Sequence, residues 1–160
     1  MPELPARHDD ECHLRQAIAL SQRSRDEGHH PFAAMVVDAD GRILSEAVNA
    51  SKDDCTGHAE VNAVRVAWAA RPAHGLARAT LYSSAEPCAM CAGAIYWSGI
   101  ARVVYALSEA HLLTLTGNHP ENPTLSLPCR EVFARGQRVV EVVGPMLETE
   151  AATAHAGFWG

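Results

Sequence analysis

The sequence predicts an α/β fold: a three-layer α-β-α sandwich in which helices cover both faces of a five-stranded mixed sheet. Short β-rich runs alternate with helical segments of about 12 residues, a pattern typical of crossover units with parallel strands. One pair of β-rich runs is instead joined by a turn containing Asp40-Gly41, which predicts an antiparallel hairpin. No linker or internal repeat divides the 160 residues, so we expect a single domain over residues 1–160.

Helices are predicted where apolar residues recur with helical spacing between residues that can begin or end a helix. Asp9 or Asp10 can cap the first helix, Pro72 stops the second, and Pro87 and Gly99 bound the third. The predicted helices span residues 11–27, 58–71, 88–98 and 128–135. Leu147, Ala151, Ala154 and Phe158 form the apolar stripe of a further helix at the C-terminus.

Strands are predicted where β-branched and apolar residues cluster between turn residues. The predicted strands span residues 33–38, 43–48, 80–84, 102–106 and 139–143. Residues 116–128 contain three prolines and no periodicity, which indicates a surface loop.

The overall composition is that of an acidic globular protein. The formal net charge is −6, from 13 basic and 19 acidic residues, and no stretch forms a Lys/Arg cluster. Nucleic-acid-binding domains usually show a basic face, so this balance argues against a large polyanionic substrate. No run approaches the ~20 apolar residues of a membrane span and no secretory segment is recognisable, so we expect a cytoplasmic protein without membrane contact.

The chemistry is indicated by His58-Ala59-Glu60 and, further along the chain, by Pro87-Cys88-Ala89-Met90-Cys91. The two cysteines stand three residues apart at the start of a predicted helix, so both sulfurs lie on one face near a helix N-terminus, which favours thiolates. His58 begins the preceding predicted helix. These three residues would bind Zn²⁺ and leave its fourth position open, as a catalytic zinc requires. Glu60 projects from another side of its helix and can transfer protons.

A zinc with an open position lowers the pKa of bound water from about 15.7 towards ~7. With Glu60 as the proton shuttle, the zinc-bound hydroxide would attack a carbon that carries an exocyclic amine and release ammonia. The alternative is a closed structural zinc in a binding module without turnover, with Cys55 or His29 as the fourth ligand. Cys12, Cys55 and Cys129 have no spacing partner and are otherwise expected to be free thiols.

These motifs resemble those of the zinc-dependent cytidine deaminase superfamily, over about residues 17–107. The segments His30-Pro31-Phe32-Ala33-Ala34 and Gly93-Ala94-Ile95-Tyr96-Trp97 are similar to guanine deaminases, whereas Arg102-Val103-Val104-Tyr105 looks equally like tRNA adenosine deaminases. Fungal-type cytosine deaminases form a third branch. The resemblance implies the cytidine deaminase-like sandwich, zinc held by His58, Cys88 and Cys91, and Glu60 as the proton shuttle.

The resemblance also implies a substrate pocket. Asn49 would bind the base edge and Phe32 would form a wall, although by themselves they also fit a turn residue and a core residue. One of His29 and His30 is a further candidate. The other expected substrate contacts are Ala59, Glu86, Trp97 and Trp159. For the tail from Phe158 to Gly160 we consider both a lid over an active site and plain packing on the domain.

We therefore expect hydrolytic deamination of an aminated nucleobase, with guanine or a related purine first. The alternatives are tRNA-specific adenosine deamination and deamination of cytosine or another aminated heterocycle. The chain departs from the tRNA branch after Leu107. It also shows no clear counterpart of the acidic loop residue of guanine deaminases, for which Glu109 and Glu121 are only nominal stand-ins, and this leaves the base open. We also expect a homodimer that buries Tyr96 or Trp97.

Overall fold

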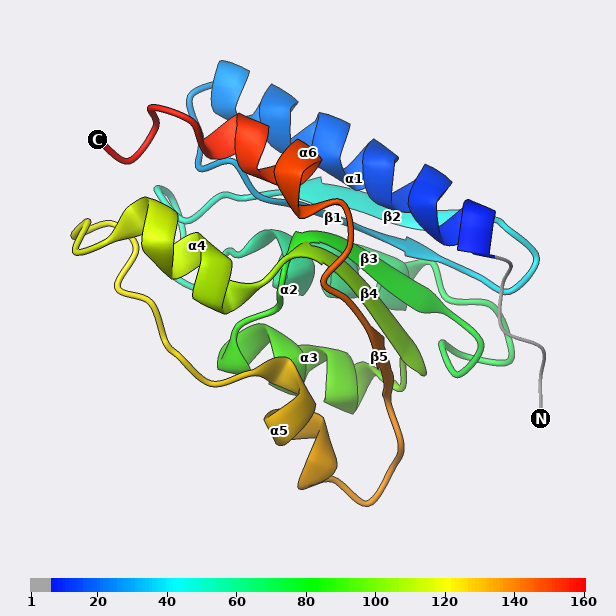
Figure 1. Ribbon diagram of the computed structural model, residues 1–160. Helices are drawn as coiled ribbons and strands as arrows, with labels where there is room; N and C mark the ends of the chain where they lie inside the picture. Colours follow the sequence, from blue (N-terminus) through cyan, green and yellow to red (C-terminus); the bar gives the residue numbers. More distant parts are fainter. Residues whose placement is uncertain (1–6) are drawn as a thin grey trace.

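A computed structural model describes residues 7–160 and confirms an α/β fold with a five-stranded mixed sheet (Figure 1). The strand order is β2-β1-β3-β4-β5. The strand β1 pairs antiparallel with β2 and β3, whereas β3, β4 and β5 run parallel, as the crossover pattern predicts. The strands are β1 (Ala33–Val37), β2 (Ile43–Val48), β3 (Thr80–Ala85), β4 (Arg102–Leu107) and β5 (Glu141–Val143).

Helices cover both faces of this sheet, as Figure 1 shows. On one face lie α1 (Arg7–Asp26) and α6 (Glu148–Ala152), and on the other lie α2 (Ala59–Ala69) and α3 (Ala89–Ser98), with α5 (Cys129–Ala134) beside α3. Neighbouring residues of a strand point to opposite faces, so Met35 packs in the core beneath α1, and Val36 packs in the core beneath α2.

Two helix starts define the edge of the sheet at which the site forms. His58 is the N-cap residue of α2, and Cys88 is the N-cap residue of α3, each with extended backbone. Gly99 ends α3 with a φ of 88°, a left-handed conformation that glycine adopts at little cost. The chain then enters β4 beside β3, which completes the parallel crossover.

The first helix begins at Arg7, not at residue 11 as predicted, so Asp9 and Asp10 lie in its first turn and do not cap it. The earlier start is explained by contacts of Asp10 with the sheet. The buried carboxylate of Asp10 accepts two hydrogen bonds from the Arg102 guanidinium, at 2.7 and 2.6 Å, and one from the Tyr82 hydroxyl at 2.9 Å. This network ties α1 to β3 and β4.

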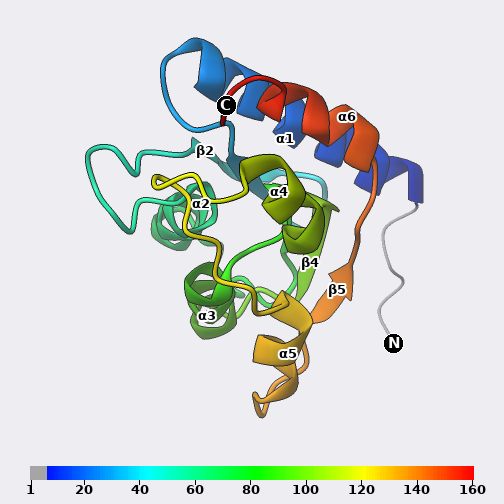
Figure 2. The same ribbon diagram turned by 60° about the vertical axis from the view of Figure 1, so that its left-hand side comes forward.

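The helix α4 (Glu109–Thr116) was not predicted. Its apolar residues form no clear stripe, because Leu112 is buried while Leu113 and Leu115 are exposed. Its local signal is a cap: the Ser108 hydroxyl accepts a hydrogen bond from the amide of His111 at 3.1 Å. Residues 117–128 are irregular, as predicted, and Figure 2 shows this segment passing from α4 along the side where α2 and α3 lie.

Two further predictions about elements were wrong. The C-terminal helix ends at Ala152 and continues only as a 3₁₀ turn over Thr153–His155, so Phe158 lies beyond it. The last strand begins at Glu141, not at residue 139. On α2, Trp68 is 45% exposed, with the Arg71 guanidinium over its ring. Within residues 7–160, no helix is long and apolar enough to cross a membrane.

The Asp10–Arg102 pair generates a test of the fold. We expect Asp10→Ala to lower the free energy of unfolding by about 3–5 kcal/mol, because the buried guanidinium of Arg102 loses both short hydrogen bonds and, among the described residues, keeps only the longer ion pair with Glu141 at 3.4 Å. Urea denaturation of Asp10→Ala and Arg15→Ala measures this, since Arg15 pairs with Glu150 on the surface and its loss costs much less. Equal losses of stability in the two variants would contradict the structural role of the buried pair.

Candidate active site

The structure brings the three expected metal ligands together. The Nδ1 atom of His58 lies 3.5 Å from the sulfur of Cys88 and 3.6 Å from the sulfur of Cys91, and the three donor atoms lie within 4.8 Å of one another. Zinc–sulfur bonds of about 2.3 Å and zinc–nitrogen bonds of about 2.0 Å in tetrahedral geometry place nitrogen and sulfur about 3.5 Å apart. The observed spacing therefore fits a single zinc ion.

The protonation of the two sulfurs also suits a cation. The pKa of Cys88 falls to about 4, because its sulfur accepts hydrogen bonds from the thiol of Cys91 and from His58. The same shared hydrogen bond, together with burial beside Glu60, raises the pKa of Cys91. The pair thus holds one proton, which a divalent cation bound between the sulfurs would displace.

Glu60 lies beside this group without belonging to it. Its side chain is buried, with 5% exposure, and one carboxylate oxygen accepts a hydrogen bond from the Ser83 hydroxyl at 2.7 Å. The other oxygen is 3.5 Å from the sulfur of Cys91. Burial raises the pKa of Glu60. A carboxyl group with a raised pKa next to a metal position can both take up and release protons.

Ser83 is a site residue that the sequence analysis missed. It lies in β3, inside a run of buried residues, where a hydroxyl needs a partner. Nothing in the local sequence identifies that partner, because Glu60 comes from a different element 23 positions away. Ser83 restrains one oxygen of Glu60 and so orients the other towards the metal group.

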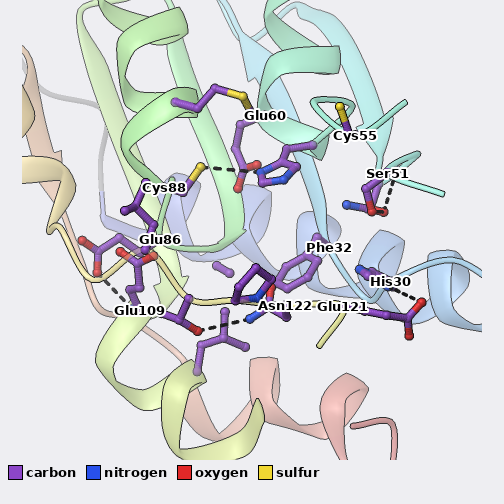
Figure 3. Close-up of a pocket in the computed structure, with 18 of the residues that line it drawn as sticks. His30, Phe32, Ser51, Cys55, Glu60, Glu86, Cys88, Glu109, Glu121 and Asn122 are labelled. Atoms are coloured by element: carbon purple, nitrogen blue, oxygen red, sulfur yellow. Dashed lines mark hydrogen bonds and ion pairs between the residues drawn. The ribbon is translucent and has the colours of Figure 1, made fainter. Parts of the chain in front are cut away.

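The metal group and Glu60 border a cavity of about 510 Å³. Figure 3 shows Glu60 and Cys88 at one end of the drawn residues, Glu86 and Glu109 along one side, and His30 and Ser51 on the opposite side. The irregular segment after α4 contributes residues 121–125 to the wall. Four lining residues are glutamates (Glu60, Glu86, Glu109 and Glu121), and Lys52 is the sole lysine or arginine in the described lining.

Of the expected substrate residues, Phe32, Asn49 and Glu86 line this cavity, and so does His30. The side-chain oxygen of Asn49 accepts hydrogen bonds from the amide and the hydroxyl of Ser51 at 3.0 and 2.8 Å. Its amide hydrogens are therefore what Asn49 can offer to a substrate.

Glu86 has a different environment from the one expected of a substrate contact. Its two carboxylate oxygens accept hydrogen bonds from the backbone amides of Glu109 and Cys129, at 3.0 and 2.9 Å. Each bond satisfies an amide at or near a helix start, because Glu109 begins α4 and Cys129 begins α5. Glu86 thus fixes the chain segments that form one side of the cavity.

Three expected substrate residues are not among the described residues that line the cavity. Ala59 is buried in the core beneath α2. Trp97 is 84% exposed on α3. Trp159 is 6% exposed, and its indole N–H donates to His155 at 3.0 Å. Its ring contacts those of Phe32 and His30, so Trp159 packs behind the cavity wall.

Cys55 lines the cavity but lies outside the ligand group. It is exposed, and the closed-site alternative would need its sulfur, or His29, close to the other three donors. Within residues 7–160, the metal-binding group consists of His58, Cys88 and Cys91 alone. This arrangement supports a three-ligand site.

Comparison with known proteins identifies the family. Residues 7–107 match the family described as the cytidine and deoxycytidylate deaminase zinc-binding region. The chain belongs to this family. It is therefore a zinc-binding deaminase that acts on C–N bonds of nucleobases or nucleosides.

Relatives within the family differ in their substrates. A probable cytosine deaminase from Schizosaccharomyces pombe is 44% identical over 94% of this chain and 92% of that protein. The guanine deaminase of Bacillus subtilis is 41% identical over 60% of this chain and 63% of that enzyme. A tRNA-specific adenosine deaminase from Haemophilus influenzae is 38% identical over 62% of this chain and 59% of that enzyme.

Solved structures agree with this assignment. A structure of guanine deaminase from Nitrosomonas europaea has a TM-score of 0.77 and 26% identity, covering 97% of this chain and 85% of that one. A solved complex with 2,6-diaminopurine has a TM-score of 0.75 and 26% identity, covering 97% and 82%.

The ligand group generates a test of metal content. We expect His58→Ala and Cys88→Ala to lose most of their zinc, because removing one of three ligands leaves an incomplete site. Cys55→Ala is the matched control and should retain the zinc content of the wild-type protein. Elemental analysis after dialysis measures it. Loss of zinc from Cys55→Ala would favour the closed site instead.

Proposed function

We propose that this protein hydrolytically deaminates a free aminated nucleobase. The observation that carries the proposal is that His58, Cys88, Cys91 and Glu60 converge at one end of a cavity large enough for a planar heterocycle. Phe32 provides an aromatic wall, and Asn49 provides amide donors.

The roles follow from the contacts. His58, Cys88 and Cys91 hold the zinc, which when bound supplies a water activated for nucleophilic attack. Glu60 would take one proton from the attacking water and pass it to the neighbouring ring nitrogen, and then take the second proton from the added hydroxyl group and pass it to the departing amine. Ser83 keeps one Glu60 oxygen fixed throughout. Water and the amine thus yield a ring carbonyl and ammonia.

The charge of the cavity supports a free base over a nucleic acid. Four glutamates and one lysine line it, and the ammonium of Lys52 donates to the carbonyl oxygen of Gly28 at 2.7 Å. Within the described lining, Lys52 is the one lysine or arginine that could pair with a phosphate, so a phosphate-rich substrate would meet little compensating charge. Affinity for tRNA would require a basic surface, which the formal charge of −6 disfavours.

Among free bases, guanine or a related purine is the first candidate, supported by the likeness to guanine deaminase from Nitrosomonas europaea and to the complex with 2,6-diaminopurine. Cytosine is the second, supported by the 44% identity with the Schizosaccharomyces pombe protein over nearly the whole chain. Ammonia release from guanine, cytosine, other aminated heterocycles and tRNA transcripts distinguishes them. Turnover of tRNA alone would overturn the proposal.

The role of Glu60 is tested by Glu60→Gln. We expect turnover to fall by about 10²–10⁴-fold, because the amide cannot accept the proton of the attacking water. Zinc content should be that of the wild-type protein, since no ligand is changed. Glu131→Gln, which neutralises an exposed glutamate on α5, is the control. Turnover of the Glu60→Gln variant within tenfold of wild type at full zinc content would refute the mechanism.

The assembly proposed here is a homodimer formed through α2 and α3. Trp97 and Trp68 border a shallow hollow on these helices together with Val64 and Ala94. Tyr96 packs against Gly136 within the chain, so of the two residues expected at the interface, Tyr96 and Trp97, the exposed Trp97 is the one available to a partner copy. Light scattering should give twice the monomer mass for the wild-type protein and the monomer mass for Trp97→Glu. A wild-type monomer at micromolar concentration would contradict this assembly.

A further inference from the structure

Glu109 is a buried acid in the cavity whose role none of the preceding functions explains. It is the first residue of α4, directly after the Ser108 cap and the end of β4, and it lines the cavity with 9% exposure. Its backbone amide donates to Glu86. Within residues 7–160, the carboxylate oxygen Oε2 is buried and has no hydrogen-bond partner.

Glu86 and Glu109 line the same side of the cavity but differ in their hydrogen bonds (Figure 3). Both carboxylate oxygens of Glu86 accept hydrogen bonds from backbone amides, as expected of a carboxylate with a structural role. Among the described residues, Oε2 of Glu109 accepts no such amide, and Lys52, the one lysine or arginine in the described lining, donates to the carbonyl oxygen of Gly28. A buried acid without a partner destabilises the folded protein, so its retention points to a ligand as the missing partner.

The electrostatic surroundings favour a neutral ligand group. Burial, followed by the charge of Glu86, raises the pKa of Glu109 to about 8, so at neutral pH its carboxyl group is mostly protonated. A neutral carboxyl group still accepts a hydrogen bond at its carbonyl oxygen and can also donate one. A neutral ring N–H with an adjacent acceptor complements both functions.

The position of Glu109 indicates which part of a substrate it meets. Figure 3 shows Glu109 beside Glu86, on one side of the cavity that Glu60 and Cys88 also line, and, after burial and the charge of Glu86, the charges of Cys88 and Glu60 contribute to the raised pKa of Glu109. Glu60 and Glu109 line the same cavity as separate groups, so a ring whose amine-bearing carbon faces Glu60 would present another of its edges to Glu109. In cytosine the remote position is N1–H, and in guanine the remote ring carries N9–H. Both nitrogens bear the sugar in nucleosides.

We propose that Glu109 is a specificity-determining residue that binds the unsubstituted ring N–H at the position where a nucleoside carries its sugar, and so selects free bases over nucleosides. This inference rests on the proposed function. It adds a chemical class, the heterocycle with a free ring N–H, and a residue that recognises it. A sugar at this nitrogen would remove the donor and leave the Glu109 carboxyl group buried without a partner.

The test measures ligand binding without turnover. The zinc-loaded Glu60→Gln protein and its Glu60→Gln/Glu109→Leu counterpart are titrated calorimetrically with cytosine and 1-methylcytosine, and with guanine and 9-methylguanine. We expect Glu109→Leu to weaken binding of the unmethylated base about 10- to 100-fold, because the N–H loses its acceptor. Binding of the methylated base should change less than about threefold, since it lacks that donor.

Two controls distinguish a role of Glu109 in ligand recognition from a role in folding stability. Glu109→Gln retains an acceptor oxygen and should bind the unmethylated base within about fivefold of the parent protein. Glu109→Leu should keep or raise the melting temperature, because it removes an unsatisfied buried acid; Glu109→Ala serves if the leucine variant does not fold. A fall in melting temperature with equal affinity for the bases would indicate a structural role and overturn the proposal.

Failure of the Glu109 proposal and failure of the proposed deamination would give different results. Equal weakening for both members of a pair, or none, would overturn the role of Glu109 and leave the deamination of free bases intact. If neither cytosine nor guanine binds to the Glu60→Gln protein and neither releases ammonia with wild type, deamination of these bases is wrong, and the assignment of Glu109 falls with it.

Discussion

The site depends on one geometric constraint, the convergence of two helix starts at the same edge of the sheet. The helix α2 follows β2, α3 follows β3, and β1 lies between these two strands. His58 and Cys88 occupy the residue before each helix, and their donor atoms lie 3.5 Å apart. Cys91 lies in the first turn of α3, and Glu60 lies in the first turn of α2. Any shift of one helix start would separate the ligands.

The sheet register stabilises this convergence. Ala34 of β1 is opposite Ser83 of β3, and the Ser84 hydroxyl accepts a hydrogen bond from the amide of Ala33 at 3.1 Å. Through Ser83 the same register also sets the position of the Glu60 carboxyl group. The pairing of β1 with β3 therefore determines where Ser83 lies, and Ser83 in turn orients the carboxyl group that is expected to transfer protons beside the metal site.

The cavity contains several acidic groups that are stabilised in different ways. Glu86 accepts hydrogen bonds from two backbone amides, and Glu60 accepts one from a serine hydroxyl and has a raised pKa. The sulfurs of Cys88 and Cys91 would be stabilised by the zinc that they can bind with His58. Oε2 of Glu109 has no such partner within residues 7–160. Such uncompensated burial costs stability, which active sites commonly sacrifice for function.

Much of this could be predicted from sequence because the determining signals are local. The His58 and Cys88-Cys91 motifs, the hairpin at Asp40-Gly41 and the crossover around α3 each lie within a short segment. What could not be predicted depends on residues distant in sequence. Ser83 donates to Glu60, which is 23 positions away, and Arg102 donates to Asp10, which is 92 positions away. The second contact holds Asp10 within the first turn of α1, so this helix begins before its expected start.

The walls of the cavity were the least predictable part. The helix α4 has no apolar stripe, and the segment after it is irregular, so no periodicity places Glu109 or Glu121 in the site. Trp159 lies at the end of the chain, where sequence alone favours exposure. It is buried because His30, Phe32 and His155 form an aromatic recess for it.

The central claim is that the zinc has three protein ligands and an open position. X-ray absorption spectroscopy at the zinc edge of the wild-type protein tests it most directly. We expect a first shell of two sulfurs at about 2.3 Å, one imidazole nitrogen at about 2.0 Å and one further light atom from solvent. A shell with three sulfurs, or with two sulfurs and two imidazoles, would show a closed structural site and contradict the account.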